Sequence, residues 1–166
     1  MKISTFIFSI IVLVACNNID VNKQLEHGIT KYKQDSLAIA LNIFNSIISQ
    51  TDTSKKAYLY RFLVNLDIKH YEDALKDIET LEILDSGKAY IYANKGALFY
   101  SQNNYEEALM NYKTALQKDP KFTLMYNTIS HMLFATGKKD EACDYYLKSI
   151  ENDKTGFNEQ IIEYCK

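Results

Sequence analysis

Residues 89–122 read AYIYANKGALFYSQNNYEEALMNYKTALQKDPKF, and this stretch decides the fold. Its small and apolar residues recur three or four positions apart in two runs, which predicts two amphipathic helices. The two helical faces are formed by Tyr92, Gly96 and Phe99, then by Tyr105, Ala108, Tyr112 and Ala115. A polar turn over residues 101–104 separates them. Pro120 prevents the second helix from continuing.

The stretch is one copy of a repeating unit. An alanine recurs at a constant interval of 34 residues, at Ala40, Ala74, Ala108 and Ala142. A period of this length is typical of an array of small units rather than of one globular core. Since Gly96 and Ala108 are small, we expect the two helices of a unit to approach closely at these positions.

The order aromatic, Gly, aromatic, Ala, aromatic, Ala, Pro in this stretch resembles the tetratricopeptide repeat. The resemblance implies an all-α, right-handed α-solenoid of four helix-turn-helix repeats, over residues 21–54, 55–88, 89–122 and 123–156, with a closing helix over 157–166. The repeat signature consists of Ala40, Ala74, Gly96, Ala108, Pro120 and Ala142. Phe62 departs from it, because a small residue is expected there. We expect either that the helices separate at Phe62 or that its ring turns into the groove.

The first residues predict a secretory leader. Lys2 precedes an apolar run that is shorter than the roughly 20 residues needed to span a bilayer. The run ends in Leu-Val-Ala-Cys at residues 13–16, which resembles the bacterial lipoprotein box. The resemblance implies a signal peptide over residues 1–15, a lipid on Cys16 and a tether over 16–20. By resemblance to lipoprotein sorting in Gram-negative bacteria, Asn17 after the lipidated cysteine favours a location at the outer membrane facing the periplasm. An uncleaved membrane anchor and ordinary secretion are the alternatives.

Cys143 and Cys165 predict a disulfide. They are equally distant from residue 154, so they lie level if the last repeat helix and the closing helix are antiparallel. The compartment that the leader implies permits such bonds. A bond closing this loop stabilises a protein by roughly 3 kcal/mol in the chain-entropy model. The alternative is two unlinked cysteines, one buried and one at a frayed end.

The sequence carries no pattern of catalytic residues. Its three histidines, His27, His70 and His131, are scattered, and neither a zinc-ligand spacing nor a Gly-rich phosphate loop occurs. A formal net charge of −2 argues against nucleic-acid binding. We therefore predict a protein that is not an enzyme and holds no metal or cofactor.

The first helices of the repeats carry residues that point away from the paired faces and predict a partner-binding groove. These groove residues are Tyr60, Leu63, Tyr90, Asn94, Asn127, His131 and Phe134. For any one ring, packing against an adjacent helix is an equal alternative. A basic column at His27, Arg61 and Lys95 indicates either charged ends in water or a stripe for an acidic partner or lipid headgroups.

Together these features predict a non-catalytic interaction module or scaffold, lipid-anchored in the bacterial cell envelope, that binds another envelope protein or a peptide segment. The alternative is an accessory protein that binds peptidoglycan or another glycan through the groove tyrosines. The oligomeric state stays open.

Overall fold

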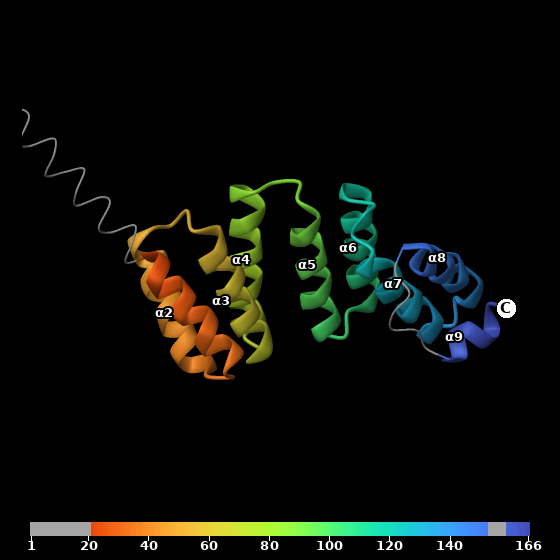
Figure 1. Cartoon of the computed structure of the whole chain (residues 1–166), viewed down its shortest axis with the longest axis horizontal. Helices are drawn as coiled ribbons and strands as arrows, with labels where there is room; N and C mark the ends of the chain where they lie inside the picture. The colour runs from red at the N-terminus through yellow and green to blue at the C-terminus, as the bar shows by residue number, and fades with distance from the viewer. Residues whose placement is uncertain (1–20, 153–158) are drawn as a thin grey trace, which may run out of the picture. The chain divides into compact units, whose positions relative to one another are not determined.

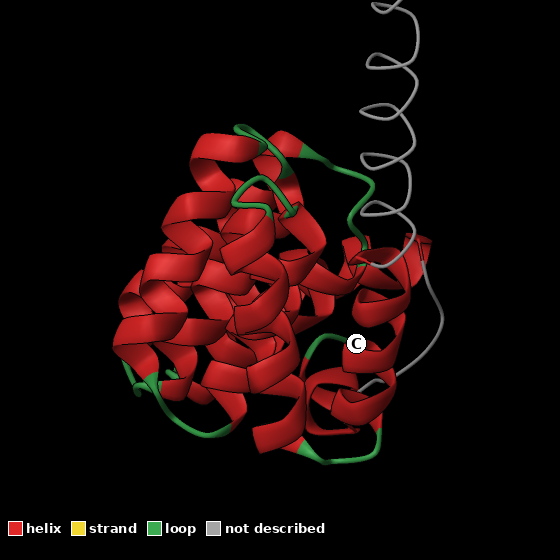
Figure 2. Ribbon diagram, turned by 90° about the vertical axis from the view of Figure 1, so that its left-hand side faces the viewer, coloured by secondary structure: helices red, strands yellow, loops and turns green. Residues whose placement is uncertain are grey.

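The computed structural model describes residues 21–152 and 159–166, and within these ranges every element is a helix (Figure 2). Residues 21–33 are helical. They are followed by α2 (Leu37–Gln50), α3 (Lys55–Asp67), α4 (Tyr71–Leu84), α5 (Ala89–Ser101), α6 (Tyr105–Lys118), α7 (Leu124–Ala135), α8 (Lys139–Asn152) and α9 (Glu159–Tyr164). The predicted all-α fold is confirmed. The predicted leader, the tether with Cys16 and the junction at residues 153–158 lie outside the described residues.

The helices belong to two compact units, one ending at Leu84 and the other beginning at Asp85. In the first unit α2 contacts α3 and α3 contacts α4; in the second unit each helix from α5 to α9 contacts the next (Figure 1). Each unit therefore contains paired helices of two predicted repeats, and the second unit also contains α9.

The alanine column marks where paired helices touch. Ala40, Ala74, Ala108 and Ala142 are all 0% exposed. A Cβ added at Gly96 would lie 2.7 Å from the Tyr112 ring and 3.1 Å from the Ala108 carbonyl oxygen, so the two helices approach closely here. In the fourth repeat the equivalent contact is a hydrogen bond, because the Ser130 hydroxyl donates to the Ala142 carbonyl oxygen over 2.9 Å.

Two expectations about aromatic residues are corrected. Phe62 is 0% exposed, so its ring lies inside the repeat and does not turn into an open groove. Tyr105 is 44% exposed rather than part of the buried face of its helix. Tyr105 is the first residue of α6. The buried contact of this helix begins one turn later, at Ala108.

The same turn closes the first helix of every repeat. A residue with positive φ recurs every 34 positions, at Asp35, Lys69, Asn103 and Gly137. At Lys69 the backbone N–H donates to the Leu66 carbonyl over 3.1 Å, and the following N–H donates to Asn65 over 2.8 Å. This pair of bonds is the Schellman motif, which satisfies the last carbonyls of a helix.

Candidate functional site

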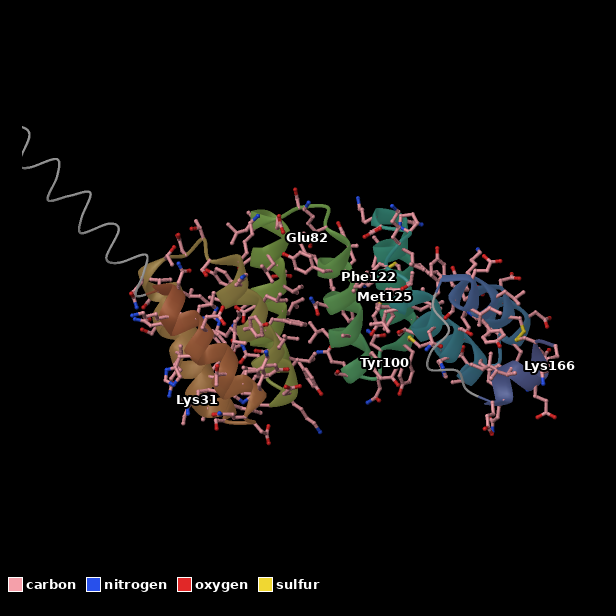
Figure 3. The ribbon with its side chains drawn as sticks, in the orientation of Figure 1. Lys31, Glu82, Tyr100, Phe122, Met125 and Lys166 are labelled. Atoms are coloured by element: carbon pink, nitrogen blue, oxygen red, sulfur yellow. A yellow bond between two sulfur atoms is a disulfide. The ribbon has the colours of Figure 1, made fainter. Side chains whose placement is uncertain are left out.

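The second unit contains a cavity of about 470 Å³. We call it the aromatic pocket. It is lined by Tyr100, Tyr105, His131, Met132, Phe134, Ala135, Thr136, Gln160 and Ile161. Tyr100, labelled in Figure 3, comes from the C-terminal end of α5, and Tyr105 from the start of α6. The remaining walls come from α7, the turn after it, and α9.

The rings at the pocket are held by one another. Tyr100 and Tyr105 meet edge to face with their centroids 5.5 Å apart, and Phe134 meets Tyr164 in the same way at 5.9 Å. The Tyr105 hydroxyl donates to Asn103 Oδ1 over 3.0 Å. Tyr100 is 50% exposed, so this residue is open to solvent while its ring contacts Tyr105. Exposed aromatic rings offer a large contact area to a binding partner.

The α9 wall is attached to the repeats at three points. Ile161, the buried residue of α9, is 1% exposed. The Tyr164 hydroxyl donates to Asp140 Oδ1 over 3.0 Å, and this bond raises the pKa of Tyr164. The sulfur atoms of Cys143 and Cys165 are 2.00 Å apart and form the bond drawn in yellow in Figure 3.

The predicted groove residues belong to both units and lie in different local surroundings. His131 and Phe134 line the aromatic pocket. Tyr60 stacks on Phe44 with centroids 5.8 Å apart, so its ring is packed against an adjacent helix. Leu63, Asn94 and Asn127 are half-buried on α3, α5 and α7.

Tyr90 lies in a different cavity of the second unit, beside Lys118 and Phe122. Its hydroxyl donates to Asp85 Oδ2 over 3.0 Å. Burial, followed by this hydrogen bond, raises the pKa of Tyr90 to about 12. The aromatic pocket thus takes only two of the predicted groove residues.

The basic column does not form a stripe at Arg61. Its guanidinium binds the Asp77 carboxylate through Nε at 3.0 and 3.1 Å and through Nη2 at 2.6 Å, and Asn65 donates to the same carboxylate over 3.2 Å. Asp77 is 1% exposed. Burial raises the pKa of Asp77, and Arg61 opposes that change. Arg61 therefore neutralises a buried acid between α3 and α4.

Sequence reasoning missed Tyr100, Tyr105, Gln160 and Ile161. The two tyrosines carry a weak signal, since they flank the polar turn of the third repeat. Gln160 and Ile161 of α9 carry no sequence signal for the pocket, because whether they line it depends on how α9 packs against the other helices.

Among the described residues, no group of three or more His, Cys, Asp or Glu side chains is placed to hold a metal ion. Within the same part of the chain, no helix combines the length and the apolar character that crossing a membrane requires.

Comparison with protein families identifies the repeats. Residues 89–122 and residues 124–155 each match the tetratricopeptide repeat. The chain is 23% identical over 146 residues to the TPR repeat-containing protein MJ1428 of Methanocaldococcus jannaschii, covering 88% of this chain and 26% of the relative. It is 31% identical over 84 residues to the small glutamine-rich tetratricopeptide repeat-containing protein 2 of Saccharomyces cerevisiae, covering 50% of this chain and 24% of the relative. The chain thus spans about a quarter of the length of these relatives.

Solved structures show the same fold at low identity. MamA from Desulfovibrio magneticus RS-1 superposes with a TM-score of 0.70 at 18% identity, covering 79% of this chain and 74% of that chain. The thermophilic TPR protein TTC0263 of Thermus thermophilus gives 0.69 at 15% identity, covering 87% and 79%. The repeat period, the paired helices and these matches agree, and residues 89–122 and 124–155 of this chain are tetratricopeptide repeats.

Proposed function

We propose that this protein binds a segment of a partner protein at the aromatic pocket. Tetratricopeptide repeats point to a protein–protein interaction module, and the pocket is the feature of the second unit best suited to that task. The observation that carries the proposal is a ring-lined cavity of about 470 Å³ beside the half-exposed Tyr100 and Tyr105. Aromatic residues in a solvent-accessible hollow are typical anchors of interfaces.

The walls suit a peptide segment. Tyr100, Tyr105 and Phe134 supply apolar surface for a side chain of the partner. His131 and Gln160 lie on the same lining and carry groups that hydrogen-bond to a peptide backbone. The proposed role is non-catalytic.

A glycan is the second candidate occupant. Of the tyrosines in the predicted groove, Tyr60 is stacked on Phe44 and Tyr90 is bonded to Asp85, so both are committed to the fold. Tyr100 and Tyr105 are the rings at the pocket that expose enough surface for a sugar to stack on. This makes peptidoglycan fragments the right competitors in a binding experiment.

The location of the module is part of the proposal. The sequence of residues 1–16 supports a signal peptide and a lipid on Cys16, and Asn17 favours the outer membrane of the cell envelope, facing the periplasm. Residues 17–20 extend over about 14 Å at most, so the first repeat lies close to the bilayer. If Cys16→Ala protein still fractionates with membranes at unchanged size, the lipid anchor is wrong.

The binding site is tested by a photocrosslinker. p-Benzoylphenylalanine at position 105 is expected to capture a partner in native membranes, whereas the same group at position 124 is not. Leu124 is the matched control, because it is 63% exposed on α7 and does not line the pocket.

The captured segment is then synthesised and titrated against purified protein. Tyr100→Ala/Tyr105→Ala is expected to weaken its binding by about tenfold or more, because ring anchors dominate interface energies. Leu124→Ala is expected to change nothing. Equal binding by the wild-type protein and both variants refutes the pocket as the binding site. Binding of peptidoglycan fragments that is lost with the two tyrosines favours the second candidate.

A further inference from the structure

One wall of the aromatic pocket does not come from a repeat. Gln160 and Ile161 belong to α9, while the other lining residues come from α5, α6, α7 and the turn after α7. The integrity of the pocket therefore depends on how firmly α9 is held.

Besides the disulfide, α9 is held by the buried Ile161, by the bond from Tyr164 to Asp140, and by the contacts of the Tyr164 ring with Phe134 and Lys139. The helix has six residues, and isolated helices shorter than about 12 residues are marginal in water. Ile161 is its one buried residue, and Glu159, Gln160, Glu163 and Tyr164 are exposed. The bond from Tyr164 to Asp140 lies at the surface, where it competes with water.

The disulfide joins α9 to the repeats directly. Cys143 is on α8, and Cys165 follows the last residue of α9, at a sequence separation of 22. Both cysteines are half-buried, so solvent reaches this edge of the unit. In the chain-entropy model, losing a bond that closes such a loop makes the docked arrangement about 100-fold less favourable.

We propose that the Cys143–Cys165 disulfide is a redox switch for the aromatic pocket: when oxidised it holds α9 as a wall, and its reduction releases α9 and removes that wall. The expected effect of the disulfide on partner binding rests on the proposed function of the aromatic pocket. The release of α9 is a property of this chain alone.

The chemistry of the switch is thiol–disulfide exchange with a dithiol reductant. A thiolate of the reductant attacks one sulfur and forms a mixed disulfide, while the other cysteine leaves as a thiolate and takes up a proton. The second thiol of the reductant then resolves the mixed disulfide. Two electrons and two protons pass to Cys143 and Cys165, and the reductant leaves as its disulfide.

Hydrogen exchange measures the release of α9. Amides in the C-terminal peptide of the full chain are expected to exchange about tenfold faster or more after treatment with a dithiol, while those of α7 and α8 keep their protection. Cys165→Ser, which alters only the end of the chain, is expected to give the same result without reductant. Unchanged exchange in the reduced wild-type protein overturns the switch.

Crosslinking from position 105 measures the effect on the partner. Cys165→Ser is expected to lower the yield by about tenfold. If α9 exchange rises and the yield does not fall, the pocket needs no α9 wall, and the switch is overturned while the proposed function stands. If position 105 captures nothing in the oxidised protein, the proposed function fails, and the exchange experiment still decides whether the disulfide holds α9.

Discussion

Replacing Arg61 by Met should destabilise the protein severely, because it leaves a buried carboxylate without its charge partner. Asp77 is 1% exposed and receives three of its four hydrogen bonds from Arg61. Methionine keeps much of the length and apolar character of the arginine stem. The perturbation therefore removes the charge and the hydrogen bonds with little change in packing.

Breaking a buried ion pair by removing one partner costs about 3–5 kcal/mol. The Arg61 side chain is 23% exposed, so water already reaches the guanidinium and the lower end of that range applies. We expect a loss of about 3 kcal/mol in the free energy of unfolding, measured by urea denaturation followed by circular dichroism. Adding Asp77→Asn should recover most of the loss, because the amide carries no charge.

The pH dependence provides a second signature. Burial raises the pKa of Asp77 above its ordinary value of 3.8, and Arg61→Met removes the opposing effect of the guanidinium. A folded-state pKa above the unfolded value means that folding favours the protonated acid, so stability is lost as pH rises through that pKa. The deficit of Arg61→Met should therefore shrink as the pH falls from 7 toward 4.

Lys76→Met on α4 is the matched control. Lys76 pairs with Asp73 over 3.0 Å, but their side chains are 70% and 57% exposed, so Lys76→Met should leave the free energy of unfolding nearly unchanged. A cost of under about 1 kcal/mol for Arg61→Met, or a deficit that does not vary with pH, would refute the buried-pair reasoning.

Three further predictions concern the repeats. Lys69→Gly should raise the free energy of unfolding by about 1 kcal/mol, because the exposed Lys69 has a φ of 63° that favours glycine; a lower value in urea denaturation contradicts this. Gly96→Ala should lower the melting temperature, since the added Cβ would lie 2.7 Å from the Tyr112 ring; an unchanged value shows that the ring moves aside freely. Burial raises the pKa of Tyr112 to about 12 from 10.0, so the stability of the folded state should fall as pH rises from 10 toward 12, and Tyr112→Phe should show a shallower fall in alkaline denaturation.

Much of the fold could be predicted because its signals are local and repeated. Helix periodicity and the polar turns are visible within a single repeat. The 34-residue interval between successive repeats, marked by Ala40, Ala74, Ala108 and Ala142, supports the same assignment. Three of the four turns have Asp35, Asn103 or Gly137 at the positive-φ position, and these residue types tolerate positive φ. The fourth turn has Lys69 there, which does not favour positive φ, so the recurrence is not evident from the sequence.

The candidate site could be predicted only in part. His131 and Phe134 lie on the unpaired face of their helix, which periodicity identifies. Tyr60 shares that property and is nevertheless packed on Phe44. Whether an outward ring is covered depends on the neighbouring helix, and one helix's periodicity does not contain that information.

The sequence by itself determined the repeat period, the helix pairs and the small residues at which they touch, because these depend on spacing along the chain. It also placed Cys143 and Cys165 at equal distances from a turn. Only the tertiary structure decided that Arg61 neutralises Asp77, that Tyr100 and Tyr105 stay open to solvent, and that α9 completes a pocket. Charge pairing, exposure and cavity walls arise where segments distant in sequence meet, and that meeting is set by packing.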